Sequence, residues 1–319
     1  MIQLFYANET GKVTDIDIAT IEKRMDLNNK WINLINPTDK EIEHISRLTG
    51  IDEDMIKAPL DDEERSRIEH DDGYSLVLFD IPYIEEEDGG YYSYSTLPLG
   101  FILSDEFVVT ISLKETAILR DFAIGRVKTF STHKRSRFLF QAFYNTATKY
   151  LQYLKQIDKA SGRIQNELHK STKNKELIQL LDLENSLVYF RTSLKGNDMV
   201  VNKLLKSNFI KKYEEDEELL EDVAIENQQA MEMACIYTDI LSGTMDAYAS
   251  VIGNNQNNIM KILTSVTLLL SIPTLISGIW GMNTWVPGQD KWWGFTIVIG
   301  LIAFICGIVG VILHKKKLF

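Results

Sequence analysis

The sequence predicts an α+β membrane protein with an N-terminal cytoplasmic α/β domain, a long helical stalk and two C-terminal transmembrane helices. Three observations carry this prediction. Short β-branched and aromatic runs alternate with helical segments in the first third of the chain. Helical periodicity continues from about residue 115 onward. Two uncharged stretches, 262–289 and 292–313, stand near the end, and each is long enough to cross a hydrocarbon core of about 30 Å.

Charge is distributed unevenly over the 319 residues. Residues 261–319 hold five Lys/Arg and one acidic residue, which leaves 29 bases and 44 acids, a net of −15, in residues 1–260. An acidic domain of this kind argues against nucleic acid as a partner. It is compatible with metal cations or basic partners, although simple solubility also explains it.

The N-terminal part, 1–133, is expected to form the α/β domain. Strands are predicted at 3–6, 31–35, 74–81, 100–103 and 107–112, and helices at 38–48 and 52–58. Thr38 and Glu41 make a capping box at the start of the first helix. The N-terminal residues lack a basic segment followed by an apolar one, so no signal peptide is expected and the domain should stay in the cytoplasm. The strand order stays open.

Long helices are predicted to follow the α/β domain. Helices at 115–129, 134–168 and 173–206 come first, and the range 134–213 is assigned to the long cytoplasmic helices. The last helix, 214–280, contains one proline, Pro273, and three glycines. At about 1.5 Å per residue, an unbroken helix of this length spans roughly 100 Å. The range 214–281 is therefore read as a stalk that becomes the first transmembrane helix over about 261–281.

An external loop, 282–291, separates the two spans, and the second span is 292–313. The tail 314–319 contains Lys315, Lys316 and Lys317. Positive charge marks the cytoplasmic side, so both termini are expected inside the cell and the protein in the plasma membrane. A buried hairpin of a soluble protein is the alternative. Because two helices cannot enclose a water-filled path, conduction would require several copies around an axis.

Small and polar residues form a stripe along the first span and its cytoplasmic extension. Their steps of three and four residues place them on one helix face. The stripe residues are Asp246, Ser250, Gly253, Asn257, Met260, Thr264, Thr267, Ser271, Thr274 and Gly278. Such a stripe can pack helix against helix, or it can line a pore. The acidic Asp246 favours the pore, because a carboxylate is costly in a dry interface. Met260 would then form an apolar constriction.

The first span ends in Gly281-Met282-Asn283, and this chain resembles the CorA family of divalent-cation transporters. The similarity extends over MDAY at 245–248, NIMKILT at 258–264 and PTLISGIWGMN at 273–283, in order and spacing. Two spans at the C-terminus and a basic tail complete it. The resemblance implies a homopentamer in the lipid bilayer that transports Mg2+, often with Co2+ or Ni2+, whereas one branch of the family, ZntB, moves Zn2+.

The resemblance also implies roles for particular residues. Gly281, Met282 and Asn283 would form the selectivity motif, with a ring of Asn283 carbonyls binding the hydrated ion. Asp246 would add a charged ring on the cytoplasmic side. Mg2+ would be the substrate and also a regulatory ligand, and no cofactor is expected. Asp222 aligns with a carboxylate of the family's regulatory site.

The sequence departs from the family's pattern at two places. Lys57-Ala58 stands where the family has the partner carboxylate of the regulatory site. Ser271 stands where an apolar gate residue is common, which leaves Met260 and Leu263 as the expected gate.

Other classes of function find less support. The five histidines show no metal-ligand spacing, and neither a nucleophile motif nor a phosphate-binding loop is present. Cys235 and Cys306 imply neither a disulfide framework nor a cysteine zinc site. An enzyme is therefore not expected, and a membrane-anchored scaffold would leave the polar stripe unexplained. A Zn2+, Co2+ or Ni2+ transporter of the same fold is the alternative that stays open.

Overall fold

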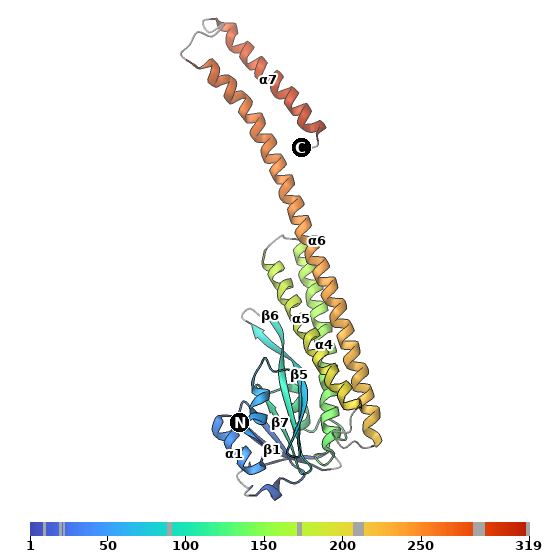
Figure 1. Ribbon diagram of the computed structural model, residues 1–319. Helices are drawn as coiled ribbons and strands as arrows, with labels where there is room; N and C mark the ends of the chain where they lie inside the picture. The colour runs from blue at the N-terminus through green and yellow to red at the C-terminus, as the bar shows by residue number, and fades with distance from the viewer. Residues whose placement is uncertain are drawn as a thin grey trace. The chain divides into compact units, whose positions relative to one another are not determined.

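The computed structural model describes residues 1–8, 11–18, 21, 23–87, 91–170, 174–206, 214–282 and 291–316 (Figure 1). The chain divides into two compact units, Met1–Gly243 and Thr244–Phe319. The division falls inside a single helix, α6 (Glu214–Trp280), so this helix contributes to both units. The units are described separately.

A mixed seven-stranded sheet forms the centre of the first unit, in the order β2-β1-β3-β7-β6-β5-β4. Within it β3 and β7 run parallel, and the other pairs are antiparallel. The strands are β1 (Ile2–Ala7), β2 (Val13–Ile16), β3 (Trp31–Ile35), β4 (Arg67–Asp71), β5 (Tyr74–Glu87), β6 (Tyr91–Leu103) and β7 (Val108–Ser112).

Helices cover both faces of this sheet. Over the described residues the helical elements are η2 (Arg24–Leu27), α1 (Asp39–Thr49), α2 (Glu53–Lys57), η3 (Ala58–Leu60), α3 (Ala117–Ala123), α4 (Arg135–Lys170), α5 (Asn174–Lys206), α6, and α7 (Trp292–Lys315). Figure 1 shows α4, α5 and the first half of α6 running alongside one another. Thr38 caps α1 as predicted, because its hydroxyl accepts from the Glu41 N–H while the Glu41 carboxylate accepts from the Thr38 N–H.

The sheet separates two hydrophobic cores. Because successive side chains of a strand point to opposite faces, Leu4 enters one core and Phe5 the other. The Leu4 core is closed by α1 and α2. The Phe5 core is closed by α3, α4 and the ends of α5 and α6, and it contains Trp31, whose ring meets Phe138 edge-on with centroids 5.0 Å apart. Both faces of the sheet are therefore buried over its central strands.

The stalk part of α6 packs through one face. Its buried positions recur at steps of three and four residues up to Ala234 and then after seven, which keeps them on one face of the helix. They are Leu220, Val223, Asn227, Ala230, Ala234 and Leu241. Asn227 donates from Nδ2 to the Leu194 carbonyl of α5 at 3.1 Å. The α6 stalk is thereby fixed to the long helices of its own chain.

A polar junction joins α5 to β5 beyond the end of β4. Asn197 of α5 is 1% exposed; its Oδ1 accepts from the Asp80 N–H at 2.8 Å and its Nδ2 donates to the Asp80 carbonyl at 2.7 Å. Burial raises the pKa of the Asp80 carboxyl, while hydrogen bonds with Ser193 and Ser66 act in the opposite direction. The Asn197 side chain thus supplies the two backbone hydrogen bonds that a neighbouring strand would otherwise give Asp80.

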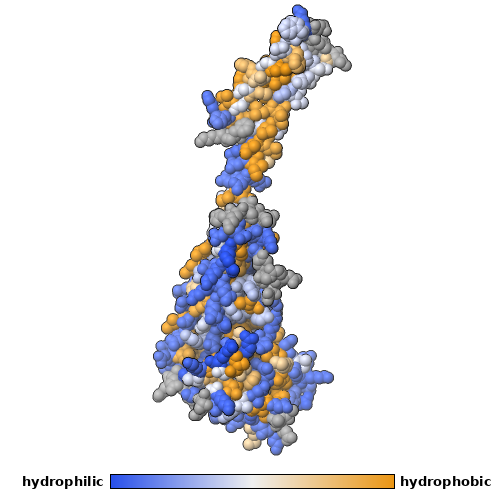
Figure 2. Space-filling model, turned by 180° about the vertical axis from the view of Figure 1, so that it is seen from behind, coloured by the Kyte–Doolittle hydropathy of each residue, from blue (hydrophilic) through white to orange (hydrophobic). Residues whose placement is uncertain are grey.

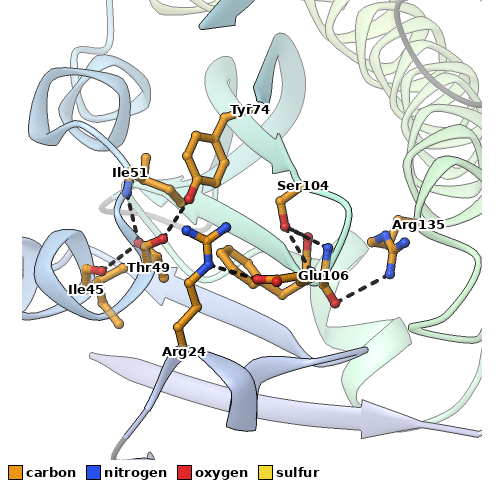
Figure 3. A network of polar contacts seen from close by, with 9 residues as sticks. Arg24, Ile45, Thr49, Ile51, Tyr74, Ser104, Glu106 and Arg135 are labelled. Carbon is orange, nitrogen blue, oxygen red and sulfur yellow. Dashed lines mark hydrogen bonds and ion pairs between the residues drawn. The ribbon is translucent and has the colours of Figure 1, made fainter. Parts of the chain in front are cut away.

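A second polar network lies at one end of the sheet, near η2 (Figure 3). Arg24 donates from Nε to Glu106 at 2.8 Å, and the hydrogen bond with Glu106 raises the pKa of the Arg24 guanidinium. Arg135, at the start of α4, donates to the Glu106 carbonyl at 3.4 Å. Tyr74 donates to the Thr49 carbonyl at 2.6 Å, which ties the end of α1 to β5. These contacts join segments that are far apart in sequence.

The predicted helices correspond to helices in the structure, with one change of length. The helix expected at 115–129 is only Ala117–Ala123. Gly125 and Thr129 have positive φ angles of 70° and 62°, which a right-handed helix does not contain. The chain therefore leaves the helix after Ala123, with Ile124 as the C-cap residue.

The predicted strands are all present, but two strands were not predicted. They are β2 and β4, which occupy the two edges of the sheet. Most of their side chains are exposed or half-buried, and β4 carries charged residues at most of its positions. Edge strands of this composition lack the apolar alternation that identifies a strand in sequence.

Candidate ion-conduction helix

The second unit contains two helices that are long and apolar enough to cross a membrane. They are α7 and the C-terminal part of α6. Many large apolar side chains of this unit are exposed, and Figure 2 shows apolar side chains over much of the face that it presents. In water such a surface would be unfavourable, whereas in a bilayer it faces hydrocarbon. Both predicted spans are therefore present as continuous helices over the described residues.

One face of α6 packs against α7. Ser265 is 1% exposed, and the side chains with reduced exposure continue from it along one face at steps of three and four residues: Leu269, Ile272, Ile276 and Trp280. On α7, Gly294 and Leu313 are buried, and Cys306 reaches α6. The α7-facing side of α6 is thereby identified.

The polar stripe lies on the side of α6 that α7 leaves open. All ten of its residues are exposed: Asp246, Ser250, Gly253, Asn257, Met260, Thr264, Thr267, Ser271, Thr274 and Gly278. A Cβ atom added at Gly253 or Gly278 would meet nothing within 4 Å. The described part of the chain thus supplies no partner for this face.

Four hydroxyl groups of the stripe share one arrangement. Each donates its proton to the carbonyl four residues earlier: Thr264 to Met260 at 2.7 Å, Thr267 to Leu263 at 2.8 Å, Ser271 to Thr267 at 2.7 Å and Thr274 to Leu270 at 2.9 Å. A hydroxyl whose proton is used in this way retains oxygen lone pairs and acts as an acceptor. The stripe therefore presents acceptor oxygens, which suit the water protons around a hydrated cation.

The proline of α6 has a compensating contact from α7. Pro273 has no N–H, so the Leu269 carbonyl lacks its usual helical donor four residues later. The Cys306 thiol lies 3.8 Å from this carbonyl and donates to it. Within a bilayer an unpaired carbonyl is costly, so Cys306 contributes to holding α7 at this point of α6. The sequence offered one signal for such a partner, namely the carbonyl that Pro273 frees.

The tripeptide begins as α6 ends. The Gly281 N–H donates to the Ser277 carbonyl at 2.9 Å, and a Cβ at Gly281 would lie 3.2 Å from that oxygen. A side chain at this position would therefore need a small shift of the last turn of α6. Met282 follows and is exposed. Asn283, the predicted selectivity residue, lies outside the described residues, so its role stays a prediction.

The remaining predicted site residues lie at separate levels of α6. Asp246 is exposed at the start of the second unit, and Met260 and Leu263, the expected gate, are exposed farther along the helix. Asp222 is exposed in the first unit, on the stalk. Among the described residues no group of three or more His, Cys, Asp or Glu side chains is placed to hold a metal ion. The roles of Asp222, Asp246 and Asn283 as metal ligands therefore stay predictions.

Comparison with known proteins identifies the family. The model of the family described as "CorA-like Mg2+ transporter protein" matches residues 26–315. The chain belongs to this family. It is a CorA-like membrane transporter of divalent cations and not an enzyme.

Individual relatives agree with this assignment. The chain is 29% identical over 287 residues to the cobalt/magnesium transport protein CorA of Methanocaldococcus jannaschii, and the alignment covers 86% of each protein. It is 23% identical over 313 residues to the CorA of Thermotoga maritima, covering 96% of this chain and 88% of that protein. The solved structure of the complete M. jannaschii CorA magnesium transporter superposes with a TM-score of 0.79 at 24% identity, covering 98% of this chain and 96% of that one. That likeness establishes the fold, including the α/β domain and the long helix.

Proposed function

We propose that this protein takes up Mg2+ across the plasma membrane through a homopentameric pore lined by α6. The observation that carries the proposal is the polar stripe, whose residues lie on the face of α6 that α7 leaves open. Five such faces around an axis would enclose a path lined by hydroxyl, amide and carboxylate oxygens, and α7 would form the lipid-facing ring. The names of the M. jannaschii and T. maritima relatives, which specify cobalt and magnesium transport, support this substrate class.

The chemistry of the stripe fits a hydrated ion. Mg2+ releases its water reluctantly, so a protein conducts it most readily with the water attached. Acceptor oxygens bind the water protons without replacing the water. A ring of Asn283 carbonyls is proposed to admit the hydrated ion at the outer mouth, and Asn257 and Asp246 are proposed to bind it on the cytoplasmic side. No carboxylate occurs between Asp246 and Asn283 to strip the water away.

The membrane potential supplies the driving force in this proposal. Moving two positive charges inward gains about 4–5 kcal/mol per 100 mV. The basic residues after the second span support cytoplasmic termini under the positive-inside rule, and the acidic first unit would then meet the arriving ions there. No nucleotide-binding motif is needed for uptake of this kind.

Asp222 is proposed as part of a regulatory site between subunits. Five acidic cytoplasmic parts repel one another, and divalent ions bound between them would offset the repulsion and hold the pore closed. Asp222 is exposed on the stalk, so it is accessible to a neighbouring subunit. Asp222→Ala is expected to reduce closure at millimolar Mg2+, measured as weaker inhibition of flux by internal Mg2+. Undiminished inhibition would remove Asp222 from the site.

A flux assay tests the function and separates Mg2+ from the alternatives Co2+, Ni2+ and Zn2+. The purified protein is reconstituted into liposomes that enclose an ion-sensitive dye. Uptake of each ion is then compared with and without a proton gradient. We expect the rate of Mg2+ uptake to follow the membrane potential. We also expect Asn283→Ala to abolish this uptake while the oligomer stays intact. Uptake of Zn2+ alone, or dependence on the proton gradient, would contradict the proposal.

A further inference from the structure

A cavity of about 380 Å³ lies in the first unit, between the sheet and α3. Its floor is made by β1, β2, β3 and β7, and its roof by α3 and the residues just before it. Ile35 and Ser112, the last residues of the parallel pair β3 and β7, both line it. The volume is in the range of small-molecule pockets. None of the predicted pore or regulatory residues lines it.

A row of hydrogen bonds crosses three strands and ends at the cavity. The Trp31 indole can only donate, and it donates to the Thr110 hydroxyl at 2.7 Å. Thr110 in turn donates to Asn33 Oδ1 at 2.8 Å, and Asn33 Nδ2 donates to Gln3 Oε1 at 2.9 Å. Each donor fixes the orientation of the next group, so the row orients both amides. Gln3, which lines the cavity, is left with its NH2 group as a donor.

Ser112 adds a second donor at the floor of the cavity. It is 1% exposed, and its hydroxyl has no hydrogen-bond partner within the part of the chain that the structure describes. A buried hydroxyl without a partner is unfavourable. Ser112 lines the cavity beside the polar row, so a ligand atom that accepted from its hydroxyl would remove this cost.

Charged side chains of both signs surround the cavity opening. Arg120 of α3 can only donate, and it forms no ion pair with the other described residues. Asp15 of β2 and Glu115, just before α3, also line the cavity, and the described chain gives neither of them a cationic partner. Phe5 and Leu119 supply buried apolar walls. Three donors, two carboxylates and an apolar wall thus meet in one place.

We propose that this cavity binds a free α-amino acid with an apolar side chain. The ligand carboxylate accepts from Gln3, Ser112 and Arg120, its ammonium group faces Asp15 and Glu115, and its side chain lies against the apolar wall. A carboxylate alone would leave the two acidic residues unpaired, and an amine alone would leave the three donors unpaired. The site is independent of the proposed transport function, because it shares no residue with the pore.

Calorimetric titration of the full-length protein in detergent tests the proposal, with L-leucine as the probe. Isocaproate has the same side chain and carboxylate without the ammonium group, and isoamylamine lacks the carboxylate. We expect L-leucine to bind and each analogue to bind about tenfold or more weakly, because each loses hydrogen bonds to a charged group. Absence of L-leucine binding, or equal binding of isocaproate, would overturn the proposal.

Two variants and a matched control complete the experiment. Ser112→Ala and Arg120→Gln are each expected to weaken L-leucine binding by about tenfold or more. Arg126→Gln removes an exposed guanidinium that follows α3 and does not line the cavity, so it should bind like the wild type. Ser112→Ala should keep or raise the melting temperature of the ligand-free protein, because it removes an unpaired buried hydroxyl. Wild-type binding in both variants, or a lower melting temperature in Ser112→Ala, would contradict the assignment.

Discussion

Replacing Thr274 by valine tests whether the stripe conducts, because it removes one oxygen and keeps the shape of the side chain. Thr274 donates to the Leu270 carbonyl at 2.9 Å, and that carbonyl keeps its backbone donor in the variant. Thr and Val have similar helix propensities. An exposed position without other contacts should therefore change the free energy of unfolding by less than about 0.5 kcal/mol.

The effect on conduction should be much larger than the effect on stability. A net hydrogen bond is worth about 1 kcal/mol, so the loss of one bond to the hydrated ion slows passage by about fivefold at the level of Thr274, and the loss of two by about thirtyfold. Five subunits lose the oxygen together in the proposed ring. We therefore expect Thr274→Val to reduce Mg2+ uptake by at least about fivefold.

The assay is dye-detected Mg2+ uptake in liposomes, with the amount of inserted protein and its oligomeric state measured in the same samples. Thr296→Val is the matched control, because it makes the same chemical change at an exposed position of α7, on the other span. Wild-type uptake in Thr274→Val would refute a conducting stripe, and so would an equal loss in Thr296→Val. The small-residue face would then pack against another helix instead.

Three further predictions concern the interior contacts. Asn197→Ala should lower the free energy of unfolding by about 1–3 kcal/mol, because it leaves the Asp80 N–H unpaired. Asn202→Ala, on the exposed side of α5, should have little effect. Thermal unfolding in detergent compares the two variants, and equal shifts would contradict the role of Asn197. Burial raises the pKa of the Asp80 carboxyl in the folded state, because the charged form is poorly solvated there. The contribution of the neutral carboxyl to the free energy of unfolding is therefore fully present below the ordinary aspartate pKa, and it is lost as pH rises through the raised pKa. Asp80→Asn should therefore raise the melting temperature at neutral pH and lose that advantage in acid, and the opposite trend would contradict this assignment. Cys306→Ala should lower the melting temperature more than Cys235→Ala, because only Cys306 donates to the Leu269 carbonyl that Pro273 leaves without a helical donor. Equal effects of the two variants would show that the Cys306 thiol contributes nothing to stability at this position.

The sequence determined the membrane part and the long helices. Helical periodicity and the absence of charge are local patterns, and a bilayer demands them of any spanning helix. The helix predicted over 214–280 is therefore observed as Glu214–Trp280, and the second span over 292–313 as Trp292–Lys315. The stripe was predictable for the same reason, because residues at steps of three and four share a face whatever the rest of the chain does.

Only the tertiary structure decided the contacts between distant segments. The strand order brings β3 beside β7, although more than 70 residues separate their pairs, such as Ile35 and Ser112. The cavity at their ends, the Asn197 junction and the contact from Cys306 to α6 depend on such pairings. Each of these contacts depends on how distant segments pack together, which a local sequence pattern does not contain. The membrane helices are therefore predictable from the sequence, whereas the cavity is found only in the folded α/β domain.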